Sequence, residues 1–155
     1  MNRITKSMLL CSAILTATGA TAATTATNTV TIKGDTVFSV VADTALQLPA
    51  TLQANTKIGG FKITNDSSIN GSVLVTVNQA NWDGNNVAYK KGNNSIRVKE
   101  DTAKWIWYRD KNGFQNKSSI AGGQTVDFPL LAKTDAANLV PGNYTLGVTV
   151  TATVG

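Results

Sequence analysis

The most regular pattern of apolar and polar positions lies at the C-terminal end of the chain. Apolar side chains recur there at every second position, at Tyr144, Leu146, Val148, Val150, Ala152 and Val154. Threonines occupy most of the positions between them. Because successive side chains of a β-strand point to opposite faces, this alternation predicts a strand over 144–154 with one apolar face. The chain ends with this strand, so we expect no later segment to pair with its second edge.

Short alternating or β-branched stretches also fill most of the remaining chain. Further strands are predicted at 28–32, 36–42, 61–64, 72–78, 95–99, 104–109 and 124–131. Asn, Asp and Gly cluster between these stretches, and Gly59-Gly60 is interpreted as a bend or bulge. No segment keeps a helical spacing of apolar residues over three turns. The pattern predicts an all-β protein, an antiparallel sandwich of immunoglobulin-like character.

The segment 23–35 differs from the body of the chain, which we place at 36–155. Its first residues are small and polar, and the strand predicted at 28–32 has only Val30 and Ile32 on its apolar face. Lys33-Gly34-Asp35 then separates this strand from the body. We interpret 23–35 as an extension that pairs outside its own domain.

Residues 1–22 have the three parts of a secretory signal peptide. Arg3 and Lys6 form a basic start, a short apolar stretch covers 8–17, and Ala20-Thr21-Ala22 fits a signal peptidase site. The apolar stretch is shorter than the roughly 20 residues that span a bilayer. An exported protein is therefore expected. A lipoprotein signal ending at Cys11 is the less favoured alternative, because the bulky Leu10 precedes the cysteine.

Composition excludes much of the usual catalytic and metal chemistry. Cys11 is the only cysteine, inside the predicted signal, and the chain has no histidine. Disulfides, catalytic triads, common zinc sites and other cofactor sites are therefore not expected, and we predict no enzyme. A glycosidase-like carboxylate pair assembled across loops is a remote alternative. Loss of Arg3 and Lys6 lowers the formal net charge of +5 by two, and the remaining scattered charge does not indicate a nucleic-acid partner.

Two other features are candidates for surface functions. Asn-x-Ser/Thr triplets begin at Asn65, Asn70, Asn93, Asn116 and Asn143, but a chain rich in these residues forms such triplets by chance, so glycosylation is the weaker interpretation. Trp105 and Trp107 share one face of a predicted strand and could form a receptor surface with Lys90 and Lys91. The favoured interpretation places one of these tryptophans in the core of the sandwich, with the other aromatic residues covering it.

The order of these parts resembles the pilin subunits of Gram-negative chaperone-usher fimbriae. The stretch Leu139-Val-Pro-Gly-Asn-Tyr144, followed by the alternating strand, is similar to the ends of cysteine-free colonisation-fimbria subunits. Gly142 stands where the wider pilin family places a glycine before its last strand. The resemblance covers both ends of the chain well and the middle in general pattern.

The resemblance implies an incomplete immunoglobulin-like sandwich that is completed by donor-strand exchange. The acceptor groove would be lined by the strand 144–154, and the donor strand of the next subunit would supply Asn28, Val30 and Ile32. The implied partners are other pilin subunits in a homopolymer, a periplasmic chaperone, an outer-membrane usher and a host-surface receptor. The implied location is the cell surface, reached through the periplasm, with a role in adhesion and virulence.

A self-contained secreted β-sandwich, such as a carbohydrate-binding or adhesin module, is the alternative. In that case Val30 and Ile32 would pair within their own chain, and the tryptophans would form the binding platform. The two hypotheses differ in what the extension 23–35 does.

Overall fold

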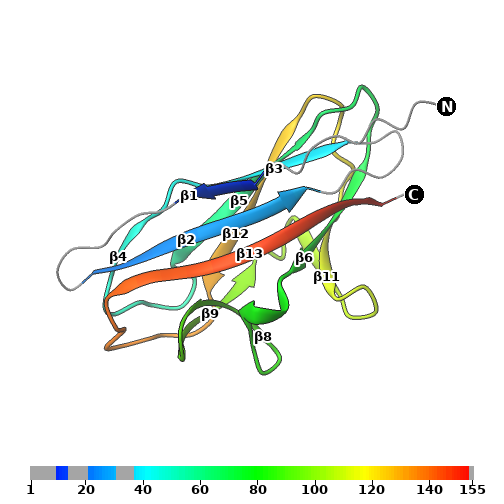
Figure 1. The fold of residues 1–155 in the computed structure, drawn as a ribbon. Coiled ribbons are helices and arrows are strands. Elements are labelled where there is room, and N and C mark those ends of the chain that lie inside the picture. The colour runs from blue at the N-terminus through cyan, green and yellow to red at the C-terminus, as the bar shows by residue number, and fades with distance from the viewer. Residues whose placement is uncertain (1–9, 14–20, 31–36, 154–155) are drawn as a thin grey trace.

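The computed structural model describes residues 10–13, 21–30 and 37–153, and for 10–13 and 21–30 it describes the backbone alone. This part of the chain is built almost entirely of strands (Figure 1). The early strands are β1 (Leu10–Ala13), β2 (Thr21–Val30), β3 (Phe38–Ala42), β4 (Gln47–Pro49), β5 (Lys57–Asn65) and β6 (Ser72–Val77). A short 3-10 helix, η1 (Gln79–Asn81), precedes β7 (Trp82–Asp83), β8 (Asn86–Lys91) and β9 (Asn94–Glu100). The remaining strands are β10 (Trp105–Tyr108), β11 (Gly113–Asn116), β12 (Thr125–Ala132) and β13 (Gly142–Thr153).

The strands form one continuous hydrogen-bonded path that folds into the two layers of a sandwich. The order along the path is β10-β11-β6-β13-β8-β9-β12-β5-β3, and every neighbouring pair in it is antiparallel. The β8–β9 hairpin joins the layer that contains β13 to the layer that contains β12. The predicted all-β, immunoglobulin-like sandwich is confirmed.

The core lies between the two layers and is filled by alternate residues of facing strands. Phe61 and Ile63 of β5 are completely buried, as are Val73 and Val75 of β6. Phe128 of β12 is the aromatic centre, with the Trp105 ring edge-on at 4.7 Å and the Phe114 ring at 5.5 Å between centroids. Each such side chain contributes roughly 1.5–3 kcal/mol by leaving water, so this shared core holds the layers together.

Five of the described strands were absent from the sequence-based prediction: β1, β4, β7, β8 and β11. In β8, the three consecutive residues Val87, Ala88 and Tyr89 are all buried, and β11 is also buried at nearly every position. A strand that is covered on both faces loses the alternation by which it could be recognised. Strand β7 has 2 residues and β4 has 3, so both are too short to show a period. Strand β1 lies within the segment that was interpreted as a signal peptide.

A glycine and two asparagines singled out in the sequence have structural roles. Gly60 lies beside the register shift between Leu130 and Leu131 of β12, and a Cβ at Gly60 would lie 2.6 Å from the Phe128 carbonyl oxygen. This confirms the predicted bend or bulge. Asn65 and Asn116 are buried and donate hydrogen bonds to backbone carbonyls, so neither amide is presented as a glycosylation acceptor.

Candidate functional site

The inward face of β13 is the apolar row that the alternation predicted. Tyr144, Leu146, Val148 and Val150 are at most 1% exposed, whereas Thr145 on the opposite face is exposed. Ala152 is half-buried and packs against the core. The candidate acceptor residue Val154 lies outside the described residues. The predicted face is therefore confirmed from 144 to 150, and it contributes directly to the core.

Asn81 anchors the middle of β13 to the rest of the sandwich. Its side-chain Nδ2 donates to the carbonyl oxygens of Thr145 at 2.7 Å and Ala88 at 3.2 Å. Its Oδ1 accepts from the Gly147 backbone N–H at 3.0 Å. This buried amide replaces strand pairing where β13 passes from β8 to β6. The sequence carries no signal for this role, since Asn81 lies among several other Asn residues.

Two contacts hold the start of β13. The Tyr144 hydroxyl donates to the Val140 carbonyl oxygen at 2.9 Å, and burial of the ring raises the pKa of this tyrosine. The Lys91 Nζ donates to the Pro141 carbonyl oxygen, and its aliphatic stem lies against Gly142. A Cβ at Gly142 would lie 2.6 Å from this stem, at a φ of +136° that favours glycine. The positive φ therefore favours glycine at this first position of β13, whereas the flexible end of the Lys91 side chain is able to move aside.

The second edge of β13 is occupied by β2 of the same chain. The two strands are parallel, and their register runs from Gly142↔Ala22 to Val150↔Val30 (Figure 1). Of the candidate donor residues, Asn28 lies opposite Val148 and Val30 opposite Val150, whereas Ile32 lies outside the described residues. The expectation that this chain cannot supply a partner for the edge is corrected: a segment N-terminal to the sandwich reaches it.

Strand β2 has neighbours on its other side as well. Its last residues pair with β1, from Leu10↔Thr29 to Ala13↔Ala26, and its first residues pair with β4, from Thr21↔Pro49 to Ala23↔Gln47. Both pairings are antiparallel. The predicted signal, 1–22, therefore contributes all of β1 and the first two residues of β2 to this arrangement.

The candidate receptor surface is not assembled as predicted. Trp105 is 2% exposed, and its Nε1 donates to the Asp127 carbonyl oxygen at 3.0 Å, so it is the core tryptophan of the favoured interpretation. Trp107 is half-buried and packs against the rings of Phe114 at 4.8 Å and Trp82 at 5.5 Å. Burial excludes Trp105 from a surface, because its indole fills the space between the layers.

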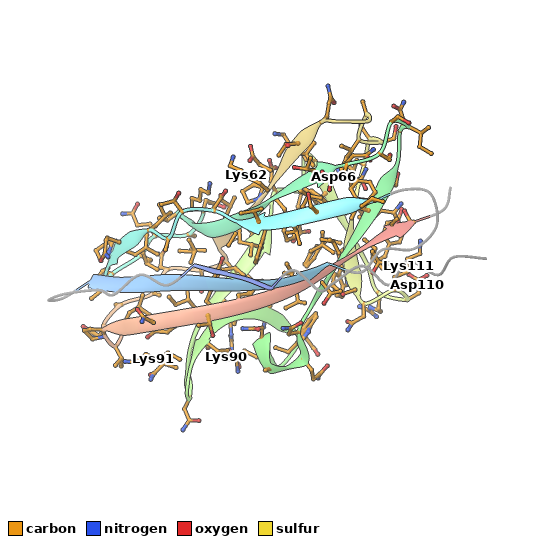
Figure 2. The ribbon with its side chains drawn as sticks, turned by 45° about the horizontal axis from the view of Figure 1, so that its top comes forward. Lys62, Asp66, Lys90, Lys91, Asp110 and Lys111 are labelled. Atoms are coloured by element: carbon orange, nitrogen blue, oxygen red, sulfur yellow. The ribbon has the colours of Figure 1, made fainter. Side chains whose placement is uncertain are left out.

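Lys90 and Lys91 lie at the end of β8, beside the start of β13. Figure 2 shows them well apart from Asp110 and Lys111, which follow the strand that carries Trp107. Trp107 instead packs against Trp82, which pairs with Val87 near the other end of β8, so the two lysines and Trp107 do not form one surface.

The described part of the chain shows neither a metal cluster nor a membrane-crossing helix. No group of three His, Cys, Asp or Glu side chains in it could hold a metal ion. None of its helices is long and apolar enough to span a bilayer.

Comparison with known proteins shows similarity at the level of the fold. No protein-family model and no curated protein sequence matches the chain. Among solved structures, it is similar to HdaB, the minor tip subunit of the E. coli Hda pilus, with 12% identity over 79% of this chain and 85% of that chain and a TM-score of 0.57. A structure of the fibronectin-binding AAF fimbriae of enteroaggregative E. coli matches at 10% identity over 68% and 90% of the two chains, with a TM-score of 0.42.

Proposed function

We propose that this chain is a structural subunit of a chaperone-usher pilus that polymerises head-to-tail and supports adhesion to host cells. The observation that carries the proposal is the edge of β13, which is completed by a segment lying N-terminal to the sandwich. The similarity of the fold to a pilus tip subunit supports the same assignment. In the filament, residues 23–35 of one subunit serve as the donor strand for β13 of its neighbour.

Donor-strand exchange follows from what β13 would lose without a strand beside it. From 142 to 147, the pairing of β13 on its other side consists of the Thr145↔Lys90 pair, the bonds of the Asn81 amide and the Asn78 N–H bond to the Gly147 carbonyl oxygen. An empty edge leaves backbone N–H and C=O groups unpaired beside an apolar row, which costs stability and favours aggregation. A strand from another subunit satisfies the same groups. Because each such contact is head-to-tail, the assembly grows as an open filament.

Signal cleavage after Ala22 would loosen the proposed donor strand. Cleavage removes β1 entirely and leaves Ala23↔Gln47 as the remaining pair with β4. The pairing with β13 from Asn143↔Ala23 onward is retained. Strand β2 then loses neighbours on one side, so its exchange for the donor of another subunit costs less free energy. During export, a chaperone in the periplasm and then an usher in the outer membrane control this exchange.

A self-contained secreted adhesin or carbohydrate-binding module is the second candidate. It is favoured by the Val30↔Val150 pair, which lies within one chain. In that case β2 is a permanent member of the sheet, and the processed chain remains a monomer at every concentration. The oligomeric state of residues 23–155 therefore separates the two functions.

The decisive experiment moves the donor strand to the other end of the chain. Residues 1–35 are deleted, and a copy of 24–33 is attached behind Gly155 through a loop of about four residues, a length that suits a hairpin. We expect a soluble monomer whose added strand pairs antiparallel to β13, because a short loop cannot support a parallel crossover. Thermal unfolding and light scattering measure its stability and mass, compared with residues 23–155.

The matched control carries Val30→Asp and Ile32→Asp in the attached copy. Each lost aliphatic burial costs roughly 1.5–3 kcal/mol, so the control is expected to unfold at a much lower temperature or to aggregate. Equal behaviour of the two fusions contradicts the donor-strand proposal. A concentration-independent monomer for residues 23–155 contradicts it as well and establishes the self-contained module.

A further inference from the structure

A cleft of about 490 Å³ opens at the end of the sandwich where three turns meet. Its walls come from the β7–β8 turn, the end of β9, the β10–β11 hairpin and the residue after β12. This volume falls within the range of roughly 300–1,000 Å³ that is typical of small-molecule sites. Neither Lys90 nor Lys91 belongs to its lining, and neither does any residue of β13.

Two indole rings form the aromatic wall of this cleft. The Trp82 and Trp107 centroids are 5.5 Å apart, with the ring planes tilted by 58°. The Phe114 ring packs against Trp107, with 4.8 Å between the ring centroids. The Trp82 indole N–H is buried and has no acceptor among the described residues. Tryptophan in a binding site combines a large apolar face with one hydrogen-bond donor.

The polar lining is predominantly cationic. Lys99, Arg109 and Lys133 line the cleft against a single carboxylate, Glu100. No salt bridge among the described residues involves any of these four groups. Arg109 and Lys133 are solvent-exposed at the mouth, and Lys133 donates to the Asn86 amide oxygen. An anionic ligand group would find uncommitted positive charge here.

Two turns hold the walls in place before any ligand arrives. Asp83 accepts from Arg97 Nε at 2.7 Å and from Ser95 Oγ at 3.0 Å, which fixes the turn after Trp82. Asn112, at a φ of 48°, closes the β10–β11 turn that follows Arg109. A site whose walls are already ordered loses less conformational entropy on binding.

We infer that this cleft binds an acidic oligosaccharide, a sugar chain with a carboxylate or sulfate group. Pyranose rings have apolar C–H faces that stack on indoles, and their hydroxyl groups bond to amides such as Asn85 and Asn112 at the rim. The acidic group pairs with Arg109 and Lys133. An acidic peptide would use the cations but leave the paired indoles without a matching face. This binding site is independent of donor-strand exchange, because it shares no residue with β13.

The test is a titration of the full chain followed by tryptophan fluorescence and saturation-transfer NMR. The probes are 3′-sialyllactose, which carries a carboxylate, a heparin tetrasaccharide, which carries sulfates, and neutral lactose. We expect at least one acidic probe to change the fluorescence and to bind roughly tenfold or more tightly than lactose. Arg109→Gln with Lys133→Gln should remove this preference, while Arg109→Lys retains part of it. Trp107→Phe should reduce the fluorescence change.

Lys62→Gln is the matched control, since Lys62 is an exposed lysine outside the cleft, paired with Asp127 at 3.0 Å. The affinity of the Lys62→Gln variant for the acidic probes should equal that of the unchanged chain. The inference would be overturned if lactose bound as tightly as the acidic sugars, or if neither acidic sugar bound. It would also be overturned if Lys62→Gln lost as much affinity for the acidic sugars as the Arg109 and Lys133 variants. Stronger binding of a pentaglutamate peptide than of either acidic sugar would overturn the assignment to a glycan.

Discussion

At the scale of single residues, Asn81 shows how one buried amide can replace several rungs of a strand ladder. It satisfies backbone groups of Thr145, Gly147 and Ala88 at the place where β13 changes its neighbour. Because the bonds to Ala88 and Gly147 are buried, no solvent molecule replaces the amide there at low cost. The connection between η1 and the last strand therefore depends on this side chain.

Asn81→Ala is expected to destabilise the fold by roughly 2–4 kcal/mol, because it leaves a buried N–H and two carbonyl groups with reduced bonding. Urea unfolding measures the change in the free energy of unfolding. Asn93→Ala, in the exposed β8–β9 turn, is the control and should change it by less than about 0.5 kcal/mol. A similar small effect for Asn81→Ala would show that β13 is held by its strand pairing alone.

The buried Tyr89 is expected to make the fold less stable at alkaline pH. Burial, and to a lesser extent the negative charge of Asp43, raise the pKa of its hydroxyl above the ordinary value near 10. Unfolded Tyr89 loses its proton near pH 10 while the folded residue keeps it, so stability is full below pH 10 and falls as pH rises beyond it. Melting temperatures from pH 8 to 11 should fall less steeply for Tyr89→Phe. Parallel curves for the two proteins would contradict this assignment.

At the scale of elements, β2 and β13 form a parallel pair in an otherwise antiparallel sheet. The alternation in β13 could be predicted because one face is buried and the other is not. The partner of β13 could not be predicted in this way, since the small polar residues at the start of β2 show little alternation. Pairing through backbone groups depends weakly on side-chain identity, and the proposed exchange between subunits relies on this property.

Removal of residues 1–22 should loosen β2 selectively. The shorter chain lacks β1 and most of the pairing with β4, so the amides of 26–30 should exchange with deuterium faster than in the full chain. Hydrogen exchange followed by mass spectrometry measures this difference. The amides of β12, which is paired on both sides by β5 and β9, serve as the internal control. Equal protection of 26–30 in both chains would show that β13 alone holds β2.

At the scale of the whole molecule, the proposed donor strand and acceptor edge can be tested separately. One partner is residues 23–155 with Val30→Asp and Ile32→Asp, which has a free acceptor and a defective donor. The other is the chain 23–155 with the donor copy fused behind Gly155, which has a filled acceptor and a free donor. Mixed together, they should form a heterodimer and nothing longer, because only one productive joint is available.

Light scattering after size-exclusion chromatography measures this assembly. Each partner alone should remain monomeric or, for the donor-defective chain, aggregate irregularly. Continued growth of the mixture beyond a dimer would show that another surface drives polymerisation. Two persistent monomers in the mixture would contradict head-to-tail exchange.

The sequence by itself determined the all-β class, the apolar face of β13 and the bend at Gly59-Gly60. These features depend on local periodicity and backbone preference, which neighbouring residues reveal directly. The tertiary structure decided which tryptophan lies in the core, how Asn81 is used, where β2 pairs, and that Trp82 and Trp107 share a cleft with Arg109 and Lys133. Such contacts join residues far apart in the chain, and only the packing of the two layers brings them together.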